Sequence, residues 1–316
     1  MTAPKRQASE AGASARRSLP LPVRDGVGPS CVALPEGDWP SIAEFLVHRF
    51  DAIPRATWQA RMRDGEVVDE HGVAVTESRP FEPRLRVYYY RAVEEEPRIP
   101  FEETVLFQDE QLLVVDKPHF LPVTPVGKYV QQSLLVRLRR KLGLAHLAPL
   151  HRIDRETAGL VMFSVQPSNR AAYSALFAGR AVHKRYEAIV PWPPGAVLPP
   201  LRRSRLAPDA HFMRMTEVDG EPNAETHFEL LERFGPGQGL ARLGLLPLTG
   251  RRHQLRVHCA AIGLPILHDA IYPLLRPEGQ DDFERPLQLL ARELSFVDPL
   301  DGSERRFTSR RVLAPR

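Results

Sequence analysis

The segment from Leu150 to Leu160 holds the residues of this chain best suited to chemistry. It reads Leu-His-Arg-Ile-Asp-Arg-Glu-Thr-Ala-Gly-Leu, which places Asp154 between Arg152 and Arg155 and predicts a Thr-x-Gly turn before an apolar stretch. A carboxylate beside a guanidinium at the mouth of a buried strand can stay ionised and act as a nucleophile. The same residue types near a turn also form ordinary structural ion pairs, so both interpretations are open on this segment alone.

A second basic segment, 249–258, follows further along the chain. Its apolar periodicity, and the glycine and proline that come after it, predict a helix over 252–262. On such a helix Arg252 and Arg256 share one face, where like charges repel each other unless an anion lies nearby. Arg256 facing Asp154 and Arg252 facing a phosphate would provide those anions. Two solvated arginines are the alternative.

Several other kinds of active site are disfavoured. His253 and His258 are five residues apart, which turns them about 140° away from each other on a helix, so they would not share a metal ion. Cys259 falls on the apolar stripe of the same helix, and the chain has no Gly-x-Ser-x-Gly, P-loop or Gly-x-Gly-x-x-Gly motif. The arginines beside Asp154 argue against a glycosidase, whose general acid must stay protonated. We therefore expect no metal and no nucleotide cofactor.

Composition sets the outer limits. The 316 residues suffice for one large domain and a smaller one, and the net charge of +4 with a pI near 9.2 is consistent with a nucleic-acid partner. No apolar run of about 18 residues occurs, so no membrane contact is expected. Cys31 and Cys259 are too few for a disulfide scaffold, which fits a reducing, cytoplasmic location.

The N-terminal part of the chain divides into an arm, a module and a linker. Residues 1–29 are predicted to be a disordered basic arm, which either contacts RNA phosphates or has no role. Residues 30–93 are predicted to form a small α/β module, and the acidic, proline-flanked stretch 94–100 a linker. Within the module we expect helices at 41–47 and 55–63 and strands at 67–68, 73–75 and 84–90. This arrangement resembles a divergent S4 RNA-binding domain; a packing module without an RNA role is the alternative.

Residues 101–316 are predicted to form the catalytic domain. Strands come in runs with few helices between them, which predicts an α+β domain with a mixed, mainly antiparallel central sheet and flanking helices. The expected strands are 112–115, 160–164, 184–190, 226–231 and 240–245, and the expected helices besides 252–262 are 134–142 and 169–177.

Five stretches in this part, taken in order, resemble the RluA-type RNA pseudouridine synthases. Residues 151–160 are similar to the family motif His-Arg-Leu-Asp-x-x-Thr-Ser-Gly-Leu. The other four stretches are 115–118, 184–188, 249–258, and 263–269 together with Tyr272. The resemblance implies the pseudouridine synthase fold and an isomerase that converts uridine in ribosomal or transfer RNA to pseudouridine, without metal or nucleotide cofactor.

The resemblance also implies roles for individual residues. Asp154 takes the position of the catalytic aspartate, which starts cleavage of the glycosidic bond by attack at C1′ or by removal of a proton from C2′. Tyr186 matches a tyrosine that packs on the target base and is implicated in the late proton transfer, and Arg256 matches the basic residue that pairs with the aspartate. Arg152 matches an arginine that fills the space left by the flipped nucleotide. Further substrate contacts are expected from Arg252, His253, Leu255 and Thr157.

We expect this enzyme to act as a monomer on RNA. The alternative on the same fold is an RNA-binding or chaperone-like protein that remodels RNA through the N-terminal module and its basic surfaces. The presence of Asp154, Tyr186 and Arg256 together favours the enzyme.

Overall fold

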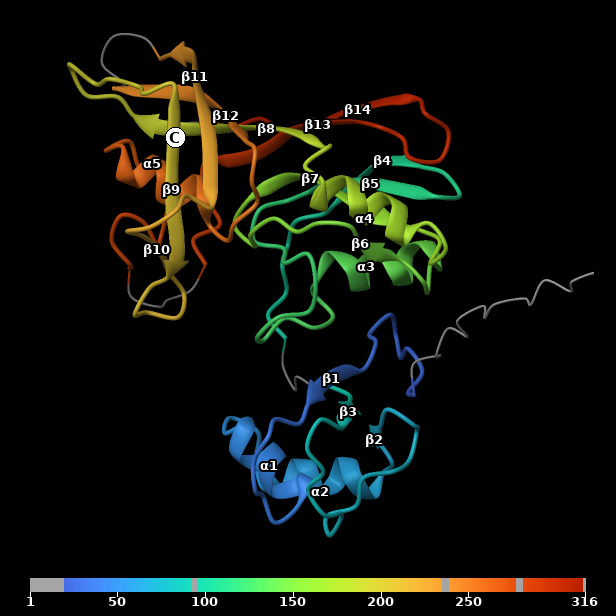
Figure 1. Cartoon of the computed structure of the whole chain (residues 1–316). Helices are drawn as coiled ribbons and strands as arrows, with labels where there is room; N and C mark the ends of the chain where they lie inside the picture. The colour runs from blue at the N-terminus through green and yellow to red at the C-terminus, as the bar shows by residue number, and fades with distance from the viewer. Residues whose placement is uncertain (1–19, 92–95, 235–238, 277–280, 315–316) are drawn as a thin grey trace, which may run out of the picture. The chain divides into compact units, whose positions relative to one another are not determined.

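The computed structural model describes residues 20–91, 96–234, 239–276 and 281–314. The chain divides into two compact units, Met1–Ala92 and Val93–Arg316 (Figure 1). Each unit has a hydrophobic core of its own. Within the described ranges, no helix has the length and apolar character needed to cross a bilayer.

In the N-terminal unit, two helices pack on a small antiparallel sheet of strand order β1-β3-β2. Ile42, Trp58 and Val87 are among the side chains that form its buried core. Ser41 caps the first helix, since its hydroxyl accepts a hydrogen bond from the Glu44 amide. The elements are β1 Ser30–Ala33, α1 Ile42–Arg49, α2 Arg55–Arg63, β2 Val67–Asp69 and β3 Arg86–Tyr89. Both predicted helices are confirmed.

Two details of this sheet differ from the prediction. The sequence does not predict β1, a strand of four residues with a proline directly before it. The strand predicted at 73–75 is reduced to one bridge between Val68 and Ala74. The reason lies in Asp69, whose Oδ1 accepts hydrogen bonds from the amides of His71 and Val73 and so turns the chain.

The segments flanking the module are packed where the structure describes them. Residues 1–19 of the predicted arm lie outside the described residues. In the rest of the arm, Leu21 is buried against Val68 and Tyr90, and the Arg24 guanidinium lies 4.0 Å from the centroid of the Tyr90 ring. In the predicted linker, the Glu96 carboxylate accepts hydrogen bonds from backbone amides at 130–132, which ties it to the C-terminal unit.

The C-terminal unit is built on an 11-stranded sheet, in the order β10-β9-β11-β12-β8-β13-β7-β5-β4, with β6 beside β7 and β14 beside β13. Among the described strands, β13 and β7 form a parallel pair and all the other pairs are antiparallel. The predicted α+β class with a mixed, mainly antiparallel sheet is confirmed. The strands are β4 Thr104–Gln108, β5 Leu112–Lys117, β6 Ala148–Pro149, β7 Ala158–Ser164, β8 His183–Pro191, β9 Leu201–Pro208, β10 Met215–Val218, β11 Ala224–Arg233, β12 Leu240–Pro247, β13 Leu289–Val297 and β14 Glu304–Thr308.

Helices lie at both ends of this sheet: α3 and α4 beside β4 to β7, and α5 beside β9 to β12 (Figure 1). Leu113 and Val115 of β5 join the core cluster of α3, whereas Leu112 and Val114 join the cluster that contains Tyr173 of α4. Because both faces of β5 are buried, its sequence is a continuous apolar run rather than an alternating one. The helices are α3 Leu134–Leu142, α4 Arg170–Ala178 and α5 Gln254–Ala261.

Gly159 lies near the start of β7, directly beside the backbone of β13. Its φ is +110°, and a Cβ at this position would lie 2.3 Å from the Ala291 carbonyl oxygen. Only glycine therefore allows the two strands to approach as they do. The turn predicted at 157–159 is wrong in its position: the Thr157 amide donates to the Asp154 carbonyl, and the strand has already begun at Ala158.

Candidate active site

Asp154 occupies a short turn between β6 and β7. The hydrogen bond from the Thr157 amide to the Asp154 carbonyl, at 3.2 Å, fixes the backbone of this turn. The Asp154 side chain is 26% exposed, so its carboxylate can be reached from solvent. The segment thus presents two part-exposed acids, Asp154 and Glu156, just before a fully buried strand.

Arg256 of α5 faces this carboxylate. Its Nη1 atom lies 3.3 Å from Asp154 Oδ2 and 3.7 Å from Glu156 Oε2. Its Nε and Nη2 atoms donate to the two oxygens of Asp269, at 2.8 and 2.7 Å, and this second carboxylate is fully buried. A bidentate pair fixes both the position and the plane of a guanidinium. The remaining nitrogen is therefore aimed at Asp154.

The charge of Arg256 is retained despite its burial. Burial by itself disfavours the guanidinium cation. The hydrogen bonds and charge of Asp269, together with the charges of Asp154 and Glu156, outweigh that effect and raise the pKa of Arg256. Three carboxylates thus surround one buried cation: Asp269 is buried, whereas Asp154 and Glu156 are part-exposed.

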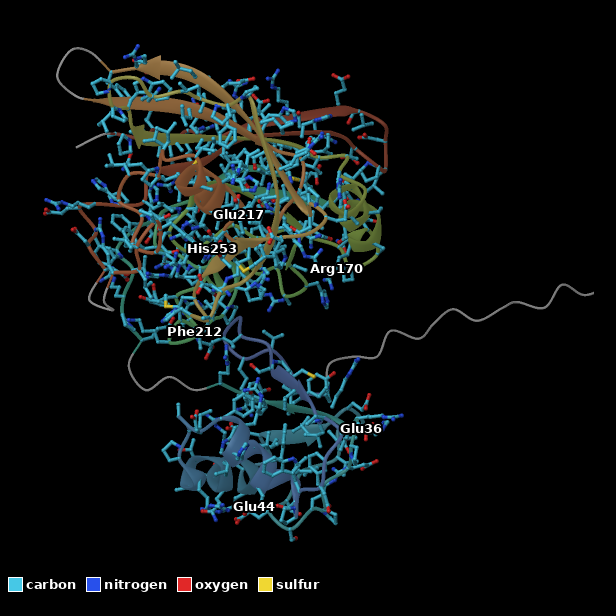
Figure 2. All side chains as sticks on the ribbon, turned by 60° about the vertical axis from the view of Figure 1, so that its left-hand side comes forward. Glu36, Glu44, Arg170, Phe212, Glu217 and His253 are labelled. Atoms are coloured by element: carbon cyan, nitrogen blue, oxygen red, sulfur yellow. The ribbon has the colours of Figure 1, made fainter. Side chains whose placement is uncertain are left out.

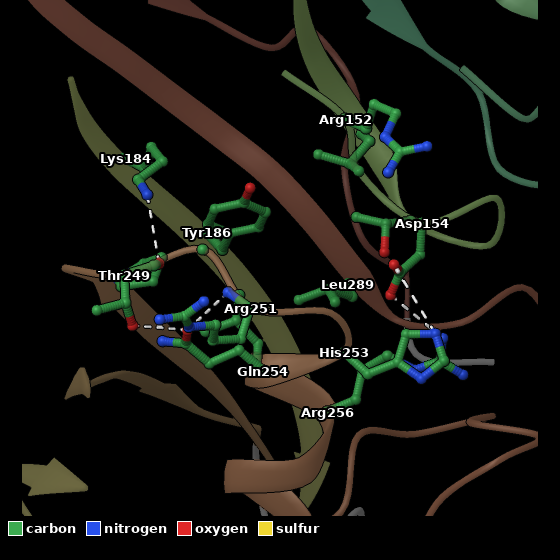
Figure 3. Close-up of a pocket in the computed structure, with 15 residues that line it drawn as sticks. Arg152, Asp154, Lys184, Tyr186, Thr249, Arg251, His253, Gln254, Arg256 and Leu289 are labelled. Atoms are coloured by element: carbon green, nitrogen blue, oxygen red, sulfur yellow. Dashed lines mark hydrogen bonds and ion pairs between the residues drawn. The ribbon is translucent and has the colours of Figure 1, made fainter. Parts of the chain in front are cut away.

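A pocket opens beside Asp154 (Figure 3). Tyr186 of β8 lies across it from Asp154, and His253 and Arg256 lie together close to the carboxylate. The pocket leads into a groove with a volume of about 880 Å³, which is the size of a ligand site. Five arginines line this groove: Arg152, Arg155, Arg180, Arg251 and Arg252. Such a surface suits a polyanion.

Residues 111–261 match the family model described as RNA pseudouridylate synthase. The ribosomal large subunit pseudouridine synthase D of Zymomonas mobilis is 32% identical over 231 residues, which are 68% of this chain and 70% of that one. The dual-specificity RNA pseudouridine synthase RluA of Haemophilus influenzae is 34% identical over 218 residues, 65% of this chain and 92% of that one. This chain belongs to the RluA-type RNA pseudouridine synthase family.

The fold agrees with solved structures of pseudouridine synthases. Human RNA pseudouridylate synthase domain containing 1 superposes with a TM-score of 0.53 at 23% identity, covering 68% of this chain and 86% of that one. At that identity the likeness concerns the fold. Together with the family match, it makes the protein a pseudouridine synthase, an isomerase, and confirms the predicted pseudouridine synthase fold.

Tyr186 of the synthase lines the pocket beside Leu255 and Leu289. Burial, with a smaller contribution from the charge of Asp154, raises the pKa of the Tyr186 phenol, so this hydroxyl stays protonated at neutral pH. Thr157, which was also predicted to contact the substrate, is 2% exposed and lines the same pocket. The structure thus brings the predicted Tyr186, Leu255 and Thr157 together with Asp154.

Arg152 differs from Arg155, the other arginine of the segment 150–160. Its side chain is exposed and lines both the pocket and the groove. Within the described ranges it forms no ion pair, whereas Arg155 makes two hydrogen bonds to Asp281, at 2.8 and 2.7 Å. Arg152 is thus available to RNA, and Arg155 is already engaged.

The position of Arg252 corrects the prediction that it shares a helix face with Arg256. α5 begins only at Gln254, because His253 adopts a left-handed conformation and the Gln254 side chain accepts from the Arg251 amide at 3.1 Å. The Arg252 guanidinium donates instead to the carbonyl oxygens of Phe212 and Met213, both at 3.0 Å.

The loop that Arg252 holds carries an exposed aromatic ring. Phe212 is 74% exposed (Figure 2) and lines the groove of the synthase. Arg252 was predicted to bind a phosphate. Its two hydrogen bonds indicate an alternative role, which is to hold this loop in place.

Three further residues support the site, and sequence reasoning gave them no role. Asp269 orients Arg256, and the Tyr272 hydroxyl lies 3.0 Å from His253 Nδ1. Lys117, fully buried, donates to three carbonyl oxygens, one of them that of Arg155 beside Asp154. All three lie in stretches that carry the family resemblance, and this resemblance was the feature of the sequence that could have identified them. Among the described residues, no cluster of His, Cys, Asp and Glu could hold a metal ion.

Proposed function

We propose that this synthase isomerises specific uridines of ribosomal or transfer RNA, with Asp154 as the catalytic carboxylate. The observation that carries the proposal is the 3.3 Å contact between Asp154 and the buried Arg256, at the base of a groove lined by arginines. One relative is named for the large ribosomal subunit, and another, from Saccharomyces cerevisiae, is named a tRNA pseudouridine(32) synthase, which supports these two substrate classes.

The reaction starts at the Asp154 carboxylate, which attacks C1′ of the target nucleotide or takes a proton from C2′. Either route breaks the bond between C1′ and N1. The uracil then turns, and C5 bonds to C1′ as the Asp154–C1′ ester bond breaks or, on the second route, as C2′ regains its proton. C5 finally loses its proton and N1 gains one. Arg256 orients the carboxylate through Nη1 and offsets its charge. Tyr186 packs on the uracil and takes part in the transfer of the C5 proton.

The target base must leave its stack to reach the pocket. In this proposal the exposed Arg152 takes the place of the flipped nucleotide, and Thr157, His253 and Leu255 contact the base or sugar. Residues 101–316 form the catalytic domain, and the module at 30–93 assists RNA binding in the manner of an S4 domain.

The test compares wild type with Asp154→Asn and Asp154→Ala, by mapping pseudouridine in ribosomal and transfer RNA from a deletion strain that carries each variant. We expect the modification at specific positions with wild type and its loss with both variants. Asparagine keeps the size of the side chain, so RNA affinity should change little. If RNA binding persists while no RNA class gains pseudouridine even with wild type, the protein acts by binding RNA and the proposal is wrong.

A further inference from the structure

His253 is held in an uncommon backbone conformation directly before α5. Its φ is 54° and its ψ is 15°, in the left-handed region that residues with a Cβ rarely occupy. The imidazole is only 8% exposed and sits between two active-site groups. Its Nδ1 lies 3.0 Å from the Tyr272 hydroxyl, and its Nε2 lies 3.9 Å from Asp154 Oδ1.

The contacts of Tyr272 determine which imidazole nitrogen carries the proton. The Tyr272 hydroxyl oxygen accepts a hydrogen bond from the Met215 amide at 2.7 Å. The hydroxyl proton is buried, and among the described residues its one acceptor within reach is His253 Nδ1. If Nδ1–H donated to the oxygen instead, that proton would be left without a partner, which is costly in a buried site. A nitrogen that accepts cannot carry a proton, so a neutral His253 is protonated at Nε2. That N–H faces Asp154.

We infer that His253 is a positioning residue: Tyr272 holds its imidazole as the Nε2–H tautomer, which presents a neutral donor to the second oxygen of Asp154. Arg256 then contacts Oδ2 and His253 faces Oδ1, so the two groups fix the plane of the carboxylate. The separation of 3.9 Å is longer than a hydrogen bond, and such contacts often shorten only when substrate is bound. The inference rests on the proposed role of Asp154.

The charges around His253 agree with a neutral ring. Burial lowers the pKa of His253, and Arg256 and Arg252 act in the same direction, whereas Asp154 and Glu156 oppose them. The neutral form matters for the chemistry. A second cation beside Asp154 would stabilise its negative charge further and make it a weaker nucleophile or base.

The decisive measurement is the tautomer of His253, read from the 15N chemical shifts of its ring nitrogens in the full chain at neutral pH. His253→Asn assigns the signals, because asparagine tolerates the left-handed backbone but cannot bridge Tyr272 and Asp154. We expect protonated Nε2 and unprotonated Nδ1 in wild type, and a mixture of tautomers in Tyr272→Phe. An Nδ1–H tautomer or an imidazolium in wild type overturns the inference.

A kinetic measurement tests whether the tautomer matters. Single-turnover pseudouridine formation in Tyr272→Phe should be slower by roughly 10-fold or more, the lower range of a lost acid–base or positioning interaction, with unchanged RNA affinity. A shifted tautomer with an unchanged rate overturns the positioning role. The NMR result requires no turnover. A wild type that forms no pseudouridine but shows the expected tautomer would therefore contradict the proposed function, and not the assignment of the proton.

Discussion

Arg256 and Asp269 form a buried bidentate ion pair, with Nε–Oδ2 and Nη2–Oδ1 distances of 2.8 and 2.7 Å. The same Asp269 oxygen that binds Nη2 accepts hydrogen bonds from the amides of Ile271 and Tyr272. Asp269 therefore connects the cation that faces Asp154 to the loop that carries Tyr272. Asp154 is thus positioned, through Arg256, by a carboxylate that lies outside its own segment.

Asp269→Asn should lower both stability and turnover. Removing one partner of a buried ion pair leaves an uncompensated charge and typically costs about 3–5 kcal/mol. The free energy of unfolding from urea titration and the single-turnover rate would be measured together. Asp281→Asn is the matched control, because Asp281 makes a similar pair with Arg155 that is part-exposed and does not face Asp154. Equal effects of the two variants would contradict the positioning role of Asp269.

Tyr186→Phe should separate the ring of this residue from its hydroxyl. Phenylalanine keeps the surface that packs on uracil, so RNA affinity should be unchanged. The rate of product formation should fall by roughly 10²-fold, because a positioned proton donor or acceptor contributes on this scale. Tyr186→Leu removes the ring as well and should also weaken RNA binding. A Tyr186→Phe variant that turns over at the wild-type rate would rule out proton transfer by the hydroxyl.

The salt dependence of RNA binding should distinguish the two interpretations of Arg252. A lysine or arginine that neutralises a phosphate contributes close to one unit to the slope of log affinity against log salt, roughly 0.7 for single-stranded nucleic acid. Because both terminal nitrogens of Arg252 bind carbonyl oxygens of the 212–213 loop, Arg252→Ala should leave this slope unchanged. Hydrogen exchange in that loop should become faster. Arg152→Ala, which removes an exposed cation, is the comparison and should reduce the slope.

The sequence predicted those elements whose pattern is local. The helix at 134–142 has one continuous apolar stripe and was predicted to the residue, and the strands predicted at 226–231 and 240–245 lie within β11 and β12. The start of α5 was misplaced, since it depends on one left-handed residue, His253, that apolar periodicity cannot reveal.

The candidate site was predictable only in part, for a similar reason. The contact between Asp154 and Arg256 was expected from the family resemblance, because charge and spacing alone left two solvated arginines as an alternative. The roles of Asp269 and Tyr272 were not foreseen, because they depend on how the loop after α5 folds back onto that helix. Gly159 was assigned to a turn, since its need for glycine comes from Ala291 on another strand.

The stability of the synthase should fall at acid pH because of His258. The ring is fully buried, and Ser204 and Thr226 hydroxyls lie 3.0 and 2.9 Å from its nitrogens. Burial, with Arg202 acting in the same direction and Glu217 opposing, lowers its pKa from 6.5 to about 4. Between pH 6.5 and about 4, His258 binds a proton in the unfolded chain but not in the folded protein. The contribution of the neutral ring to the free energy of unfolding is therefore complete above pH 6.5 and is lost as the pH falls through 4.

The expected slope of this effect is at most about 1.4 kcal/mol per pH unit for a single group. Urea unfolding of wild type and His258→Gln, at several pH values from 4 to 7, isolates the contribution of the histidine. Wild type should lose more stability than the variant on acidification. Parallel curves would show that His258 is not held neutral in the folded protein.

Gly159→Ala should be far more damaging than an alanine at another glycine with positive φ. Gly263 has a φ of +76° and open space around its missing side chain, so Gly263→Ala carries only the backbone cost, about 1 kcal/mol. At Gly159 the new Cβ would meet the Ala291 carbonyl oxygen at 2.3 Å, which forces β7 and β13 apart. The expected result is a loss of several kcal/mol in the free energy of unfolding, the range of core overpacking with backbone strain.

Because β7 begins four residues after Asp154, turnover should fall even under conditions in which Gly159→Ala remains folded. Equal free energies of unfolding for the two alanine variants would show that the close approach of these strands does not constrain the active site.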